Sequence, residues 1–244
     1  EEIANEIDTN LYEGITTRKI YQMAYSMLNK KHKPMAAKYR IKKAIMELGP
    51  SGFPFEKFIG VLLSVLGSKV KLNQILPGAC VNHEVDIIAE DDRKTAIIEC
   101  KYHNLQGAIC DVKVPLYIHS RFRDLMANAD KTGKEYQCWI ITNTRFSADA
   151  LQYGNCAGLH LLCWDYPAKD NLKDLIDKYK LYPISCLTTI TRREKELLLD
   201  QGIVLCRELT TKSDVLKEIN VSEGRISNII SEAMSLANMA VVMR

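Results

Sequence analysis

"HEVDIIAEDDRKTAIIECKYH", residues 83–103, decides the fold, because two apolar runs flank the charged tetrapeptide of residues 91–94. Strand-length apolar runs on either side of a short polar turn predict a β-hairpin. A symmetric register places Asp86 opposite Glu99, and Lys101 lies two residues beyond Glu99 on the same face. A β-bulge would shift this register, and the sequence leaves that alternative open.

Two carboxylates that face each other inside a sheet need a partner of opposite charge, because like charges directly opposite are destabilising. Lys101 or a divalent cation would offset the repulsion, and carboxylates suit Mg²⁺ or Mn²⁺. Such an ion binds phosphate and lowers the pKa of a bound water. Asp86, Glu99 and Lys101 therefore supply the parts that phosphodiester hydrolysis needs. The alternative is a hairpin with solvated acids and a surface salt bridge.

The segments around the hairpin predict an α/β fold. A helix begins near Pro54 and ends at Gly67, and Glu56 lies at the edge of its buried stripe. After the hairpin we expect a helical region, a buried strand, a short helix and another strand, near residues 117–130, 138–144, 146–154 and 158–167. Strands that alternate with helices indicate a partly parallel sheet.

Three blocks in one order carry a family resemblance: "FPFEKFIGVLLSVLG", "HEVDIIAEDDRKTAIIECKY" and "CWIITNTRFSADALQYG". Together, over about residues 50–167, they resemble the PD-(D/E)xK nuclease superfamily, especially Mrr-like restriction endonucleases. One departure is Val85 in place of proline, at a position that varies in the superfamily. The resemblance implies an α/β restriction-endonuclease-like core (mixed central sheet flanked by helices) over residues 49–183, with helical N- and C-terminal segments.

By position, the resemblance implies that Asp86 and Glu99 are ligands of Mg²⁺ or Mn²⁺. Glu56 would be a supporting acid that reaches the metal, and Lys101 would orient the attacking water or stabilise developing charge. The alternative for Glu56 is a helix-surface glutamate that captures a lysine. His83 and His103 flank the hairpin, and both are expected to be peripheral or to contact phosphate.

Residues 1–48 are expected to form a distinct helical unit, because residues 14–46 hold nine Lys/Arg and no Asp or Glu. Two helices are expected, at about 16–29 and 33–47. The pair resembles the second half of an ATP cone, with its "YR" motif at Tyr39 and Arg40. That family's phosphate-binding segment lies further upstream, so ATP binding is expected only in a longer chain. A solvated basic face and attraction to DNA phosphates are the alternatives.

Residues 184–244 are expected to be helical, after a linker at 182–187. The helices are placed at about 191–201, 210–218 and 222–238. "DQGIVLCREL" and "EINVSEGRISNII" resemble helix-hairpin-helix modules, in which backbone N–H groups hold DNA phosphates. The second block departs from the usual Gly-x-Gly because Gly224 comes late. Packing or oligomerisation is the alternative role for this segment.

The composition and the first residues indicate whether the protein belongs to the membrane, secreted or cytoplasmic class. No apolar run approaches about 18 residues, so we expect no membrane span. The acidic start "EEIANEID" lacks a signal-peptide pattern and an initiator methionine, as a fragment or processed chain would. Eight cysteines without zinc-binding spacing predict reduced, structural thiols in a cytoplasmic protein.

The leading hypothesis is a metal-dependent endonuclease that hydrolyses DNA, in restriction or defence. A homodimer or higher homo-oligomer is expected, because cleavage of both strands takes two active sites or sequential nicks. One alternative is a catalytically silent, nucleotide-regulated DNA-binding scaffold. Another is a structure-specific nuclease for junctions or RNA, since the core chemistry does not choose the polymer.

Overall fold

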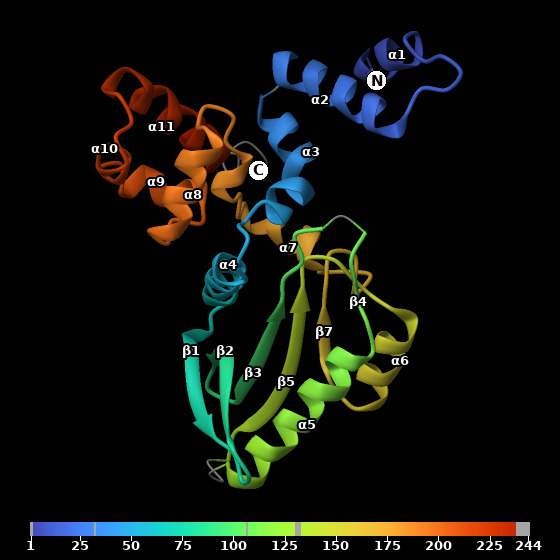
Figure 1. Cartoon of the computed structure of the whole chain (residues 1–244), viewed down its shortest axis with the longest axis vertical. Coiled ribbons are helices and arrows are strands. Elements are labelled where there is room, and N and C mark those ends of the chain that lie inside the picture. The colour runs from blue at the N-terminus through green and yellow to red at the C-terminus, as the bar shows by residue number, and fades with distance from the viewer. Residues whose placement is uncertain (1, 32, 106, 130–132, 238–244) are drawn as a thin grey trace.

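The α/β part of the molecule is built on a five-stranded sheet in the order β1-β2-β3-β5-β7 (Figure 1). The computed structural model describes residues 2–31, 33–105, 107–129 and 133–237 of the 244-residue chain. The strands are β1 (Lys69–Pro77), β2 (Asn82–Glu90), β3 (Lys94–Lys101), β5 (Glu135–Thr142) and β7 (His160–Leu162). β2 pairs antiparallel with both β1 and β3. β5 pairs parallel with both β3 and β7. The predicted mixed α/β fold is confirmed.

The hairpin of β2 and β3 has the predicted register through its outer half, where Ile88 pairs with Ile97 and Glu90 with Thr95. Asp91 begins its turn: the carboxylate Oδ1 accepts the backbone N–H groups of residues 93 and 94, each at 2.7 Å. An aspartate that bonds its own backbone in this way stabilises a tight turn. The hairpin therefore forms from local sequence signals.

One face of the sheet is covered by α4 (Phe53–Val65) and α7 (Leu172–Tyr179). Pro54 stands in the first turn of α4, and Gly67 follows the helix at φ 98°, a left-handed conformation that suits glycine. Side chains of α4 pack on the apolar residues that β2, β3 and β5 present to this face, Ile87, Ala89, Ile98 and Ile141. The predicted helix between Pro54 and Gly67 is confirmed.

The opposite face is covered by α5 (Lys113–Asn128) and α6 (Ala148–Cys156). Ile118 and Leu125 of α5 are buried, and β2, β3 and β5 present to them the side chains Val85, Ile88, Ile97 and Ile140. Two short parallel strands, β4 (Ile109–Cys110) and β6 (Arg145–Phe146), pair beside this layer. The sheet is therefore sandwiched between helices.

The remaining helices gather at one end of the sheet (Figure 1). The N-terminal group is α1 (Glu2–Asp8), α2 (Thr17–Lys31) and α3 (Lys33–Met46). The C-terminal group is α8 (Arg192–Asp200), α9 (Cys206–Thr211), α10 (Val215–Glu218) and α11 (Glu223–Ala237). α2 and α3 match the predicted pair, whereas the single helix expected at 210–218 is interrupted between α9 and α10.

The expected linker at 182–187 is wrong, because this segment is core. Residues 182–187 are all buried, and Ile184–Cys186 form a 3-10 turn, η1. The Ser185 hydroxyl donates to the Ala44 carbonyl of α3 at 2.6 Å. One continuous cluster of buried side chains joins α3, α4, the sheet, η1 and α8–α11. The three-segment division of the chain stays a prediction.

The eight cysteines are all free, as predicted, and six of them are buried. Burial raises the pKa of the Cys100 and Cys206 thiols well above the usual value, which keeps both neutral. In the described part of the chain, no helix is both long enough and apolar enough to cross a membrane.

Candidate functional site

β2 and β3 separate at Asp86. The pairing ends at Ile87 and Ile98, and the Asp86 carboxylate Oδ2 instead accepts the backbone N–H of Cys100 at 2.7 Å. Val85 packs toward α5 while Ile87 packs toward α4, so the strict alternation of the strand is broken at this point. The half-buried Asp86 side chain therefore fills the gap between two diverging strands.

Glu99 is held by an arginine from the helix that covers its face. Arg121 of α5 donates from Nη1 to Glu99 Oε2 at 2.9 Å, and its Nη2 donates to the Glu84 carbonyl oxygen. The two side chains are 15% and 18% exposed, so the ion pair is largely removed from water. Sequence reasoning missed Arg121. Its position between the buried Ile118 and Leu125 was the available signal, because a charge beside an apolar stripe needs a partner.

Glu56 approaches the same acids from α4. Burial, followed by the charges of Asp86, Glu99 and Glu84, raises the pKa of Glu56 to about 7. Burial and Asp86 raise the pKa of Glu99 to about 6, although Arg121 and Lys101 act in the other direction. Burial also raises the pKa of Asp86, against the Cys100 N–H bond and the Arg121 charge. The charges of Asp86 and Glu99 thus act on Glu56, and the ligand roles of the three carboxylates stay a prediction.

Lys101 ends β3 with an exposed side chain. Its charge lowers the pKa of Asp86 and of Glu99, which places the ammonium within electrostatic range of both carboxylates. Lys101 Nζ forms no salt bridge with any residue that the structure describes. Its carbonyl oxygen accepts the Thr142 hydroxyl of β5 at 2.6 Å, which fixes the backbone below the side chain.

The two flanking histidines have structural surroundings. His83 Nε2 lies 2.7 Å from the Asp124 carboxylate of α5, which also accepts the Cys80 and Val81 N–H groups. These bonds, with that to His83 first, lower the pKa of Asp124 to about 2. The backbone N–H of His103 donates to Asn143 Oδ1 at 2.9 Å. Burial, followed by the charge of Lys101, lowers the pKa of the His103 imidazole. Neither histidine contacts Asp86 or Glu99 through any hydrogen bond among the described residues.

The carboxylates of Glu56, Asp86 and Glu99 do not surround a position where a metal ion could bind. Among the described residues, no three His, Cys, Asp or Glu side chains converge closely enough to hold a metal. At Glu99, Arg121 already bonds Oε2. The donor chemistry nevertheless suits a hard cation, because the acids provide oxygen ligands. Burial, followed by repulsion from the neighbouring acids, raises the pKa of Glu56 and of Glu99.

An uncharacterized protein of Archaeoglobus fulgidus is 38% identical over 176 residues, which cover 70% of this chain and 95% of that relative. The model of the AF1548-like C-terminal family matches residues 182–237. The chain belongs to the AF1548-like family. A crystal structure described as that of a protein of unknown function, AF1548, has a TM-score of 0.65 and 32% identity, covering 77% of this chain and 98% of that one.

The family-model match and the carboxylate cluster occupy different parts of this AF1548-like chain. The match spans η1 and α8–α11, whereas Glu56, Asp86, Glu99 and Lys101 all precede it.

Proposed function

We propose that this protein is a metal-dependent DNA endonuclease with a restriction-endonuclease-like core of the PD-(D/E)xK type. The proposal is supported by the position of Asp86 and Glu99 where β2 and β3 separate, with Glu56 of α4 within electrostatic range of both and Lys101 at the end of β3. A nuclease of this type requires carboxylates from a hairpin, an acid from the preceding helix and a nearby lysine. All four positions are filled in this chain.

Asp86, Glu99 and Glu56 would hold Mg²⁺ or Mn²⁺. Asp86 Oδ1 and Glu99 Oε1 accept no hydrogen bond from the described residues, so each carboxylate retains an oxygen for a ligand. Glu56 is half-buried on α4 and faces the charge of both acids. When bound, the ion would lower the pKa of a water and neutralise charge on the phosphate.

The residues of the chain have separate tasks in this proposal. The Lys101 ammonium would orient the attacking water or stabilise the negative charge that develops on the phosphate oxygens. The Cys100 N–H keeps Asp86 turned into the gap between the strands. Arg121 fixes the Glu99 carboxylate by its bond to Oε2 and by its second bond to the β2 backbone.

The flanking helices would provide contacts with the substrate. α8–α11 are proposed to hold DNA as helix-hairpin-helix modules, in which helix N-termini bind phosphate oxygens. The helix pair α2–α3 is proposed to be the remainder of an ATP-cone-like unit. A homodimer would supply a second active site for the second strand.

Cleavage of supercoiled plasmid DNA with Mg²⁺ tests the proposal. Wild type is expected to nick and linearise the plasmid, and Lys101→Ala or Asp86→Asn is expected to be at least about 100-fold slower. Lys69→Ala is the matched control, because Lys69 is an exposed lysine at the start of β1. Equal Mg²⁺-dependent cleavage by Lys101→Ala and wild type would remove Lys101 from the mechanism, and absence of cleavage on modified and unmodified DNA would count against the enzyme.

One observation favours a second candidate, a catalytically silent DNA-binding scaffold. Arg121 already forms an ion pair with Glu99, and the described carboxylates do not surround a position for an ion. A scaffold would bind DNA equally well with Asp86→Asn and would show no Mn²⁺ binding by calorimetry. The nuclease requires Mn²⁺ binding that Asp86→Asn abolishes.

A further inference from the structure

A cavity of about 1250 Å³ lies between the N-terminal helix pair and the edge of the α/β core. Its walls come from α2, α3, the loop before β4 and the turn between β5 and β6. This volume exceeds the roughly 300–1,000 Å³ of a small-molecule pocket. The cavity therefore has room for more than one nucleotide unit of a polymer.

The walls of the cavity are strongly basic. Five cationic side chains contribute to them and no carboxylate of the described residues does; the cations are Arg18, Arg40, Lys42, Lys43 and Arg145. Glu47 lies 3.5–3.6 Å from Arg40 and Lys43, and Asp165 lies 2.9 Å from Arg145. Two acids thus face five cations, which leaves an excess of positive charge. The described residues provide no salt-bridge partner for Arg18 or Lys42.

The same cavity presents aromatic faces. The rings of Tyr21 and Tyr39 are stacked with centroids 4.7 Å apart, and Tyr39 is 41% exposed. Arg40 lies over the Tyr25 ring at 5.3 Å. A stack that ends in an exposed ring can be continued by another flat group. Basic side chains interleaved with tyrosines are the arrangement by which proteins hold unpaired nucleic-acid strands.

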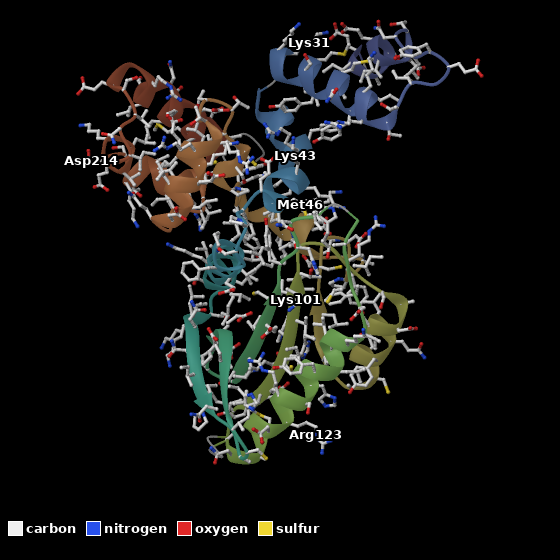
Figure 2. The ribbon with its side chains drawn as sticks, in the orientation of Figure 1. Lys31, Lys43, Met46, Lys101, Arg123 and Asp214 are labelled. Atoms are coloured by element: carbon white, nitrogen blue, oxygen red, sulfur yellow. The ribbon has the colours of Figure 1, made fainter. Side chains whose placement is uncertain are left out.

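The cavity is connected to Lys101 through short contacts. The Thr144 hydroxyl in the cavity wall lies 3.2 Å from the Thr142 hydroxyl, which donates to the Lys101 carbonyl. Met46, another wall residue, accepts through its carbonyl oxygen the hydroxyl of Tyr102, the residue after Lys101, at 2.7 Å. Figure 2 labels Lys43, Met46 and Lys101 in this order from the N-terminal helices toward the sheet.

We propose that this cavity binds a single strand of DNA, with bases stacked on the tyrosines and phosphates held by the cations. An unpaired strand fits better than a duplex, because only unstacked bases can reach the Tyr39 face. It also fits better than a free nucleotide, because the cations extend from Arg18 on α2 to Arg145 on β6. The delivery of this strand to Lys101 rests on the proposed nuclease function, whereas the binding itself does not.

Fluorescence anisotropy with a labelled 15-nucleotide thymidine oligomer, in EDTA, tests the binding. Reversal of two cavity cations, Arg18→Glu with Lys42→Glu, is expected to weaken binding at least tenfold and to reduce the salt dependence. Arg123→Glu is the matched control: Arg123 is exposed on α5, and Figure 2 labels it at the opposite end of the sheet from Lys43. Tyr39→Ala is expected to weaken binding about tenfold, and Tyr39→Phe to retain it because the ring remains.

Three further results test the binding of a single strand in the cavity: variant binding, duplex competition and ATP competition. Equal binding by the cavity and control variants, or equal competition by a duplex of the same length, would overturn the proposal. Displacement of the oligomer by stoichiometric ATP would overturn it in favour of a mononucleotide site. Circular dichroism melting of each variant excludes misfolding as the cause of a loss. Binding that follows the proposal without plasmid cleavage would defeat only the nuclease function, and cleavage without cavity-dependent binding would defeat only this inference.

Discussion

Arg121 is the residue on which the charge balance of the site depends. It lies on α5 and bonds both the Glu99 carboxylate and the β2 backbone, so it connects three elements. Even with this partner, the pKa of Glu99 is raised to about 6, because burial and Asp86 outweigh the guanidinium. Removal of the cation would leave a buried carboxylate beside two others.

Replacement of Arg121 by methionine is therefore expected to lower the free energy of unfolding by about 3 kcal/mol. Methionine keeps an apolar stem in the space but provides no charge. A second change, Glu99→Gln, is expected to recover much of this loss, since the amide needs no cation. Urea unfolding of the two single variants and the double variant measures the coupling.

The control for that cycle is Arg123→Met, two residues away and exposed on the same helix. Its expected effect is within about 0.5 kcal/mol. Strictly additive losses in the Arg121 and Glu99 variants would show that the ion pair does not stabilise the fold.

Residue types and spacing pointed to most residues of the candidate site, but not to Arg121, the ion-pair partner of Glu99. Asp86, Glu99 and Lys101 share a hairpin, and Glu56 borders a helix stripe, so short-range patterns drew attention to them. The family resemblance then selected them as site residues. Arg121 comes from α5, 22 positions after Glu99, and only the packing of α5 on the sheet brings the two together. The break in the β2–β3 pairing could not be predicted either, because the apolar pattern is compatible with the symmetric register and with a β-bulge.

At the scale of elements, an ion pair joins two of the C-terminal helices, α8 and α11. Thr191 and Glu194 form a capping box at the start of α8. Arg225 of α11 donates to both Glu194 oxygens, at 2.6 and 3.0 Å, and to the Thr189 carbonyl at 2.9 Å. The Arg225 bond first, and then the Thr191 contacts, lower the pKa of Glu194 to about 2.

A depressed acid pKa contributes stability above its unfolded value, near 4.5, and loses it as pH falls toward the folded value, about 2. Glu194→Gln keeps the cap geometry and removes the charge. Wild type is expected to be more stable at pH 7 by about 1 kcal/mol, because Arg225 is partly exposed and screened. The difference should shrink between pH 4.5 and pH 2, as thermal unfolding at a series of pH values would show. A difference that is constant over this range would exclude the ion pair as its source.

Elements whose ends are marked by their own residues could be predicted from the sequence. Elements whose structure depends on contacts with distant segments could not. The α4 helix has Pro54 and Gly67 at its two ends, and the hairpin has its charged turn. β1 was not predicted: its alternating residues describe a strand, but the pattern does not say which strand it pairs with. The segment at 182–187 contains Pro183 and Ser185, which are typical of loops. Ser185 is buried only because α3 supplies a carbonyl for its hydroxyl.

At the scale of the whole molecule, the C-terminal helices and the sheet share one core. The continuous cluster includes Phe58 of α4, Ile98 of β3, Leu187 after η1 and Ile229 of α11. Lys57 of α4 also donates to the Gly202 carbonyl, beyond the end of α8. Two parts that bury the same side chains cannot separate without exposing them to water. Cooperative unfolding of the sheet and the C-terminal helices follows from this shared core.

The last prediction concerns Leu187, which is fully buried at the junction. Leu187→Ala is expected to cost about 2–5 kcal/mol, through lost burial and the cavity that remains. Both tryptophans, Trp139 and Trp164, lie in the cluster on the sheet side, so their fluorescence reports unfolding of the sheet. Hydrogen exchange reports α8–α11 separately. The two midpoints in urea should coincide in wild type and fall together in the variant, while the exposed Leu105→Ala leaves both in place. A fall of the helix midpoint alone would mean that the C-terminal helices fold as an independent unit.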